Sequence, residues 1–150
     1  MKTRIISGAV LTVILVGAVL GGGTTMFILA AIITALGLYE LYKVVGIEKK
    51  ALGICGYILA ASFYTMLWFD KLQYLEYFCV ASGILTMFVY VCSFKTTRAK
   101  QAAFSLLGIY YVAIPISYIY RIRIMEKGIF IFILVFVCSW IADTCLLYTS

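Results

Sequence analysis

The chain has 150 residues, of which 65% are hydrophobic and only 12% are charged. Soluble domains carry about 25% charged residues, so this composition excludes an ordinary soluble protein and indicates a membrane protein. The net charge is +6. Because the basic residues lie between apolar runs, they predict orientation in a bilayer rather than nucleic-acid binding. The 5 cysteines form no Cys-x-x-Cys pair and the chain has no histidine, so neither disulfides nor a zinc site is expected.

Apolar runs of about 20 residues, the length that crosses the hydrocarbon core as a helix, recur along the chain. The first run follows Lys2 and Arg4 and is expected to be an uncleaved helix, with a secretory signal peptide as the alternative. Pro115 lies inside the fifth run and is expected to kink it. A membrane β-barrel would need short alternating strands, whereas these runs are continuously apolar. We therefore predict an all-α polytopic membrane protein with about six transmembrane helices, over residues 5–20, 24–45, 51–69, 74–94, 102–120 and 128–143.

Lysine and arginine fall unevenly on the two sides of this predicted arrangement. The side of the N-terminus holds eight of the 12: Lys2, Arg4, Lys43, Lys49, Lys50, Lys95, Arg98 and Lys100. The other side holds the remaining four, Lys71, Arg121, Arg123 and Lys127. The positive-inside rule then places the N-terminus in the cytoplasm, and the basic loop at residues 95–101 is expected to attract anionic lipid. The sixth helix would end on the cytoplasmic side, where Asp143 could meet a water-soluble substrate.

Asp143 is the strongest candidate for a functional-site residue, because placing a carboxylate in an apolar membrane run costs free energy. It could hold a divalent cation that neutralises nucleotide phosphates, or it could simply end a helix at the interface. Glu40 could pair with Lys43 one helical turn on or contact a substrate directly. Arg121 and Arg123 are expected to anchor a helix end at the lipid headgroups, with a catalytic role as the alternative.

Three stretches of the chain resemble one known family in their order and spacing. Residues 1–8 read MKTRIISG, a basic pair that enters a first helix, and residues 35–41 read ALGLYEL, with a Tyr-Glu pair near the end of the second helix. Residues 139–145 read SWIADTC. This last stretch is similar to the Asp-Thr-x-Ala-Tyr element of phosphatidate cytidylyltransferase, also called CDP-diacylglycerol synthase. The resemblance covers about residues 1–145.

The resemblance implies a nucleotidyltransferase of phospholipid synthesis in a bacterial inner membrane. Such an enzyme converts CTP and phosphatidic acid to CDP-diacylglycerol and pyrophosphate, with Mg²⁺ as the cofactor. It implies that Asp143 lies in the nucleotide- and metal-binding region, without assigning it a catalytic role. The implied partners are CTP, phosphatidic acid and the lipid bilayer, with a homodimer as a further possible assembly and no nucleic acid.

The chain departs from the family pattern after Cys145. The family continues with Ser-x-x-Lys-Arg, Lys-Asp, His-Gly-Gly and Asp-Arg-x-Asp elements, whereas Leu-Leu-Tyr-Thr-Ser follows here. We therefore expect residues 1–145 to be the N-terminal transmembrane part of a truncated, inactive cytidylyltransferase. We expect residues 146–150 to be a non-native tail encoded by a sequencing adapter, an idea that a native transcript encoding the same tail in frame would contradict.

Two alternatives come from other classes of protein. One is a small multi-span transporter or channel subunit, which would use Glu40 and Asp143 as intramembrane ion or proton sites. The other is a structural membrane scaffold, for which Asp143→Asn would be harmless in a full-length version.

Overall fold

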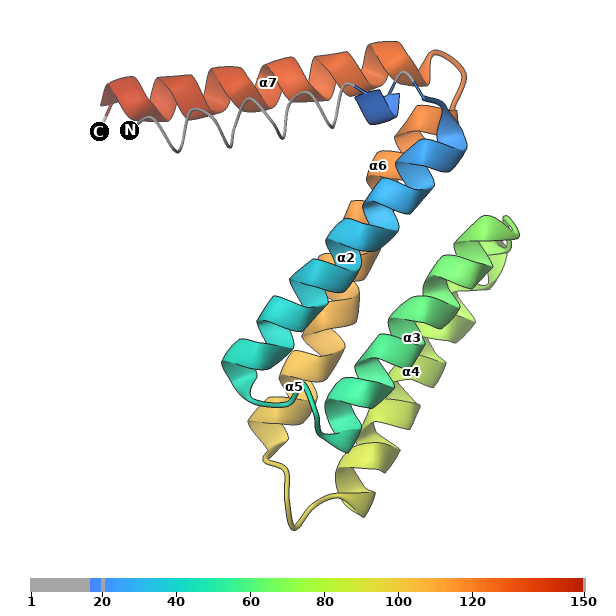
Figure 1. Ribbon diagram of the computed structural model, residues 1–150, viewed down its shortest axis with the longest axis vertical. Helices are drawn as coiled ribbons and strands as arrows, with labels where there is room; N and C mark the ends of the chain where they lie inside the picture. The colour runs from blue at the N-terminus through green and yellow to red at the C-terminus, as the bar shows by residue number, and fades with distance from the viewer. Residues whose placement is uncertain (1–16, 20, 150) are drawn as a thin grey trace. The chain divides into compact units, whose positions relative to one another are not determined.

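The computed structural model describes residues 17–19 and 21–149, apart from the side chains of residues 136, 140, 143, 144 and 146–149. Every regular element in this part of the chain is helical (Figure 1). The elements are α2 (Gly23–Val45), α3 (Ala51–Trp68), the 3-10 turn η1 (Leu72–Tyr74), α4 (Leu75–Cys92), α5 (Ala99–Leu107), the π segment η2 (Gly108–Ala113), α6 (Ile114–Ile124) and α7 (Gly128–Thr149). The chain divides into unit 1, Met1–Ala30 with Tyr118–Ser150, and unit 2, Ala31–Ser117.

Four helical stretches of the described chain are long and apolar enough to cross a membrane: α2, α3, η1 with α4, and α5 through α6. They coincide with four of the six predicted runs, so the prediction of an all-α polytopic membrane protein is confirmed. The first predicted run, residues 5–20, lies almost entirely outside the described residues. The sixth corresponds to α7, in which Gly128–Ser139 forms a shorter apolar helix. The count of six spans and the orientation stay predictions.

Two helical stretches extend beyond their predicted limits. The α5–α6 stretch covers 99–124 rather than 102–120, and α7 continues past Asp143 to Thr149. Lysine and arginine are good helix formers whose long side chains reach water from a helix end, so the basic residues at the ends of the α5–α6 stretch do not stop that helix. Because α7 continues to Thr149, Asp143 lies within a helix, and the interpretation that it ends one does not hold.

The C-terminus of α2 is closed by a left-handed glycine, Gly46, with φ of +70°. The amide of Gly46 donates to the Lys43 carbonyl at 3.1 Å, and the amide of Ile47 donates to the Tyr42 carbonyl at 2.9 Å. This is the Schellman arrangement, in which an apolar residue after the glycine packs back on the helix. Ile47 is fully buried, so the turn into α3 is fixed by packing as well as by hydrogen bonds.

Unit 2 is organised around Tyr42, which is fully buried. Its ring fits between two glycines, because a Cβ atom on Gly56 of α3 would collide with the Tyr42 hydroxyl and one on Gly108 of η2 would lie 2.8 Å from it. The hydroxyl donates to the Ser105 carbonyl at 3.0 Å, and the Ser105 hydroxyl donates to the Leu52 carbonyl at 2.9 Å. Small residues that admit a close neighbour, joined by interhelical hydrogen bonds, are how helices associate where apolar contact alone gives no preference.

The fifth span contains a π segment, η2, immediately before Pro115. A proline cannot donate to the carbonyl four residues earlier, which here belongs to Tyr111. In η2 a backbone hydrogen bond spans five residues rather than four: the amide of Ile114 donates to the Ile109 carbonyl. The predicted distortion at Pro115 is therefore present as a change of helical pattern within one continuous stretch, a device that is frequent at functional sites.

Within unit 1, a small apolar cluster joins residues just before α2 and in its first turns to α6 and to α7. Ala18, Val19 and Met26 are buried, and Phe132 of α7 packs against them together with Leu29, Ile119 and Tyr120. The Arg123 side chain donates through Nε to the Val19 carbonyl at 2.9 Å.

Candidate functional site

The loops that follow α2 and α4 are joined at one end of unit 2. Gln101, in the first turn of α5, donates through Nε2 to the Val45 carbonyl at 3.2 Å. Its Oε1 accepts from the Arg98 amide at 3.2 Å and from Lys50 Nζ at 3.3 Å. Lys50 Nζ also donates to the Thr96 carbonyl at 3.1 Å. One amide side chain and one ammonium group thus hold both loops and the end of α2 together.

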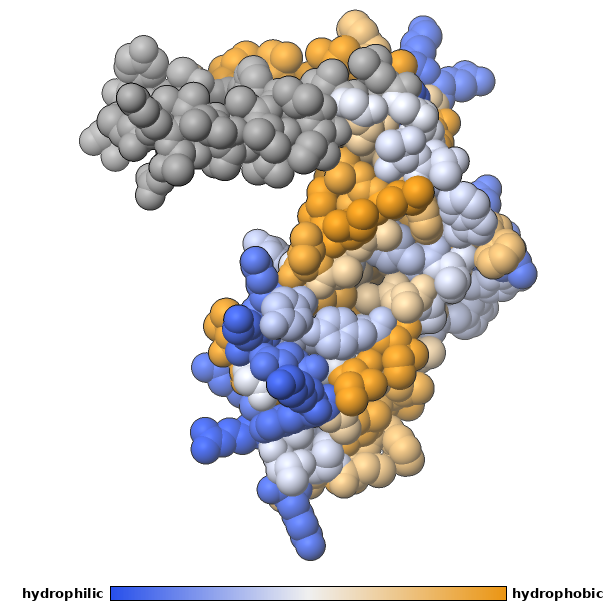
Figure 2. Space-filling view, in the orientation of Figure 1, coloured by the Kyte–Doolittle hydropathy of each residue, from blue (hydrophilic) through white to orange (hydrophobic). Residues whose placement is uncertain are grey.

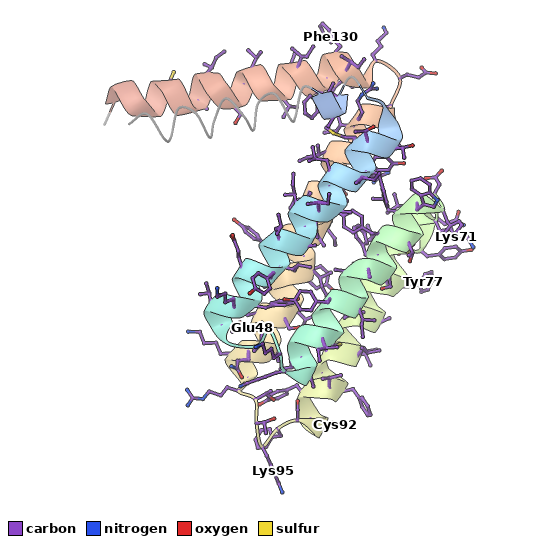
Figure 3. All side chains as sticks on the ribbon, in the orientation of Figure 1. Glu48, Lys71, Tyr77, Cys92, Lys95 and Phe130 are labelled. Atoms are coloured by element: carbon purple, nitrogen blue, oxygen red, sulfur yellow. The ribbon has the colours of Figure 1, made fainter. Side chains whose placement is uncertain are left out.

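This end of unit 2 is strongly basic. Glu48, Cys92 and Lys95 lie here in Figure 3, with Lys71 at the opposite end, and Figure 2 shows hydrophilic residues gathered over this end. We call it the basic end and define it by six cations and two carboxylates. They are Lys43, Lys49, Lys50, Lys95, Arg98, Lys100, Glu40 and Glu48.

The charge of the basic end is six minus two, or +4, among the described residues. The opposite end of unit 2 holds Asp70, Lys71 and Glu76, which give one minus two, or −1. All the cations of the basic end are exposed except Lys50, which is half-buried. The two ends of the same helical unit therefore present opposite charge to their surroundings.

The interior polar groups of unit 2 serve packing. Thr34 and Tyr64 share a hydrogen bond of 2.6 Å, and the Tyr110 hydroxyl lies 2.9 Å from the Ser82 hydroxyl and donates to the Cys79 carbonyl. The Tyr57 hydroxyl is buried without a hydrogen-bond partner. Apart from that hydroxyl, these groups satisfy one another as helix-to-helix contacts do in a membrane.

The residues predicted from the sequence belong to different units of the chain. Asp143 belongs to α7 in unit 1, and its side chain lies outside the described residues. Glu40 belongs to unit 2 and is exposed on α2. The neighbouring Lys43 places its ammonium group over the Tyr39 ring, 5.8 Å from the ring centroid.

Arg121 and Arg123, predicted to anchor a helix end, do have structural contacts at the end of α6. The Arg121 guanidinium lies over the Tyr118 ring, 5.5 Å from the centroid. Arg123 donates through Nε to the Val19 carbonyl at 2.9 Å.

Two residues that organise unit 2 were not predicted from the sequence. Gln101 lies at the end of a basic loop and has no recognisable sequence pattern, since two of its partners, the Val45 carbonyl and the Lys50 ammonium group, come from a distant segment. Tyr42 is one of 12 tyrosines, and only the glycines that receive it from other helices distinguish it. Among the described residues no group of three or more His, Cys, Asp or Glu side chains could hold a metal ion.

The described residues show the class of protein to which the chain belongs. It is a helical membrane protein, and one end of its unit 2 is basic and is held together by Lys50 and Gln101. Residues 2–148 match the family model described as the cytidylyltransferase family. The chain belongs to the cytidylyltransferase family, which makes it a nucleotidyltransferase with a CTP-type nucleotide as substrate. No curated protein and no solved structure matches the chain. The resemblance to the phosphatidate cytidylyltransferases is thereby confirmed at the level of the family.

Proposed function

We propose that this chain acts in the CTP-dependent conversion of phosphatidic acid to CDP-diacylglycerol, with release of pyrophosphate. The match of residues 2–148 to the cytidylyltransferase family carries the proposal. The Tyr-Glu pair that ends at Glu40 and the stretch around Asp143 narrow it to a lipid phosphate as acceptor, because they resemble the phosphatidate enzymes.

In this reaction an oxygen of the lipid phosphate forms a bond to the α-phosphorus of CTP. The bond from that phosphorus to the oxygen bridging the α- and β-phosphates breaks, and pyrophosphate leaves with the bonding electrons. Both reactants are anions, so a surface that carries positive charge favours their approach. The net charge of +4 at the basic end of unit 2 supports such a reaction at the membrane surface.

The charge difference between the ends of unit 2 also supports the predicted orientation. With +4 at the basic end and −1 at the end that contains Lys71, the positive-inside rule favours a cytoplasmic basic end. CTP would then be available on that side. We propose a bacterial inner membrane as the location, and a homodimer as the assembly, which cross-linking of the reconstituted chain tests.

Asp143 is proposed to lie in the nucleotide- and metal-binding region. Because the described residues supply no metal site of their own, the proposed Mg²⁺ requirement depends on Asp143 and on groups outside the described part of the chain. Mg²⁺, when bound, would neutralise phosphate charge.

The test is transfer of label from CTP, labelled in its α-phosphate, to lipid in vesicles that contain the protein. Phosphatidic acid is compared with diacylglycerol, which has the same chains and no phosphate. Label that reaches lipid only with phosphatidic acid supports the proposal, and label that reaches diacylglycerol equally would refute it.

A further inference from the structure

The exposed cations of the basic end come from four separate segments of unit 2. Lys43 lies in the last turns of α2, Lys49 in the loop before α3, Lys95 in the loop after α4, and Arg98 and Lys100 at the start of α5. In the sequence these residues form two groups about fifty positions apart. The fold makes them one surface, because Lys50 and Gln101 tie the two loops to each other.

The surface has the composition expected at the level of lipid headgroups. Each contributing segment adjoins an end of an apolar helix that is able to cross the membrane. Aromatic side chains accompany the cations: Lys43 lies over Tyr39, and Lys100 lies over the Phe104 ring at 5.9 Å from its centroid. Tyrosine and basic residues together mark the boundary between hydrocarbon and water, so this pattern is the one expected of cations at the depth of lipid phosphates.

We propose that the basic end of unit 2 binds the headgroups of anionic phospholipids and draws them from the surrounding leaflet. Clusters of four to eight Lys and Arg beside a membrane span attract anionic lipid, each cation contributing about a fivefold factor at the surface. The five exposed cations outnumber the two carboxylates, Glu40 and Glu48. This binding does not depend on the proposed catalysis, and a lipid is favoured over nucleic acid because apolar helices continue directly from the charged loops.

Cys92 provides a reporter at this surface, because it is exposed at the end of α4 (Figure 3). A fluorophore is attached to a chain that retains only this cysteine, and the protein is placed in bilayers that contain a small fraction of lipid with a nitroxide on the acyl chain. Phosphatidylglycerol and phosphatidylcholine with the same nitroxide chain are compared. We expect the anionic lipid to quench about fivefold more effectively in about 50 mM salt, and the difference to fall in about 500 mM salt, where charges are screened.

Variants and a second reporter locate the effect. Replacing Lys95, Arg98 and Lys100 together by glutamine should abolish the preference, whereas Lys95→Arg with Lys100→Arg should keep it. Trp68, at the opposite end of unit 2 and 51% exposed, is the matched reporter in a chain with Trp140→Phe, and should show no preference.

Equal quenching of the Cys92 fluorophore by the two lipids would overturn the proposal, and this result does not depend on the charge variants. An equal preference at Trp68 would also overturn it, because the attraction would then not belong to the basic end. A preference that survives both high salt and the triple glutamine variant would overturn the electrostatic basis.

Discussion

Replacing Gly56 by alanine is expected to loosen unit 2, because the new methyl group would occupy the place of the Tyr42 hydroxyl. The Tyr42 ring is close on both sides, with its Cζ 2.7 Å from the Cβ position of Gly56 and its hydroxyl 2.8 Å from that of Gly108. The tyrosine side chain has only two torsions about which the ring can rotate, so the ring cannot avoid the new methyl group by a small movement. Accommodating the methyl group moves α3 away from α2 and breaks the hydrogen bond from the Tyr42 hydroxyl to the Ser105 carbonyl.

The size of the effect follows from these two contributions. Forcing an extra methyl group into a well-packed interior costs about 1–3 kcal/mol. Losing an interhelical hydrogen bond in a membrane protein costs about 0.6–2 kcal/mol. Together they give about 2–5 kcal/mol, which corresponds to an increase of about 30-fold to about 5,000-fold in the population of the opened state.

Cys55 reports this opening, because it is only 6% exposed and packs against Leu59 and Ile109 in unit 2. With the other four cysteines replaced by alanine, its rate of alkylation by N-ethylmaleimide measures how often the interior opens. Tyr42→Phe, which removes only the hydroxyl and lies outside α3, should raise the rate about 3-fold to about 30-fold.

The matched control is Gly83→Ala in α4, where a Cβ atom would have nothing within 4 Å. Alanine is the better helix former by about 1 kcal/mol, so alkylation of Cys55 should stay the same or slow. If Gly56→Ala reacts at the rate of the unmodified chain, Tyr42 is not held between the two glycines, and the account of the interior of unit 2 is refuted.

Three further predictions concern the turn after α3, the end of α6 and α7. Asp70→Gly should stabilise unit 2 by about 1 kcal/mol and slow the same alkylation about fivefold, because Asp70 has φ of +53°, a conformation that glycine adopts without strain; a faster reaction would contradict this. Arg123→Ala should expose the Val19 carbonyl and speed amide hydrogen exchange over residues 21–30 about 5-fold to about 30-fold, with little change for Arg121→Ala, and equal rates in both variants would refute the contact. In an active version of the protein, Asp143→Asn should lower transfer of label from CTP to phosphatidic acid at least tenfold without changing the amount of protein in the membrane, whereas full activity would favour a structural Asp143.

Some features could be predicted from single stretches of sequence. The helices follow from runs of apolar residues, because a backbone in lipid must pair its own amides and carbonyls. The end of α3 at Trp68, just before Asp70, and the distortion before Pro115 also follow from local chemistry. The family was predicted from short patterns around Glu40 and Asp143. The boundary at residue 145 and the role of Asp143 remain predictions.

The sequence alone therefore determined the fold class, the membrane setting and the family, since each depends on composition or on short contiguous patterns of residues. Only the tertiary structure decided which residues matter inside unit 2 and how its loops meet. Uniformly apolar helices do not mark the faces that pack, so nothing local pairs Tyr42 with Gly56 and Gly108. The same holds for Gln101, whose partners Lys50 and Val45 lie about fifty residues away and become neighbours only when the helices pack.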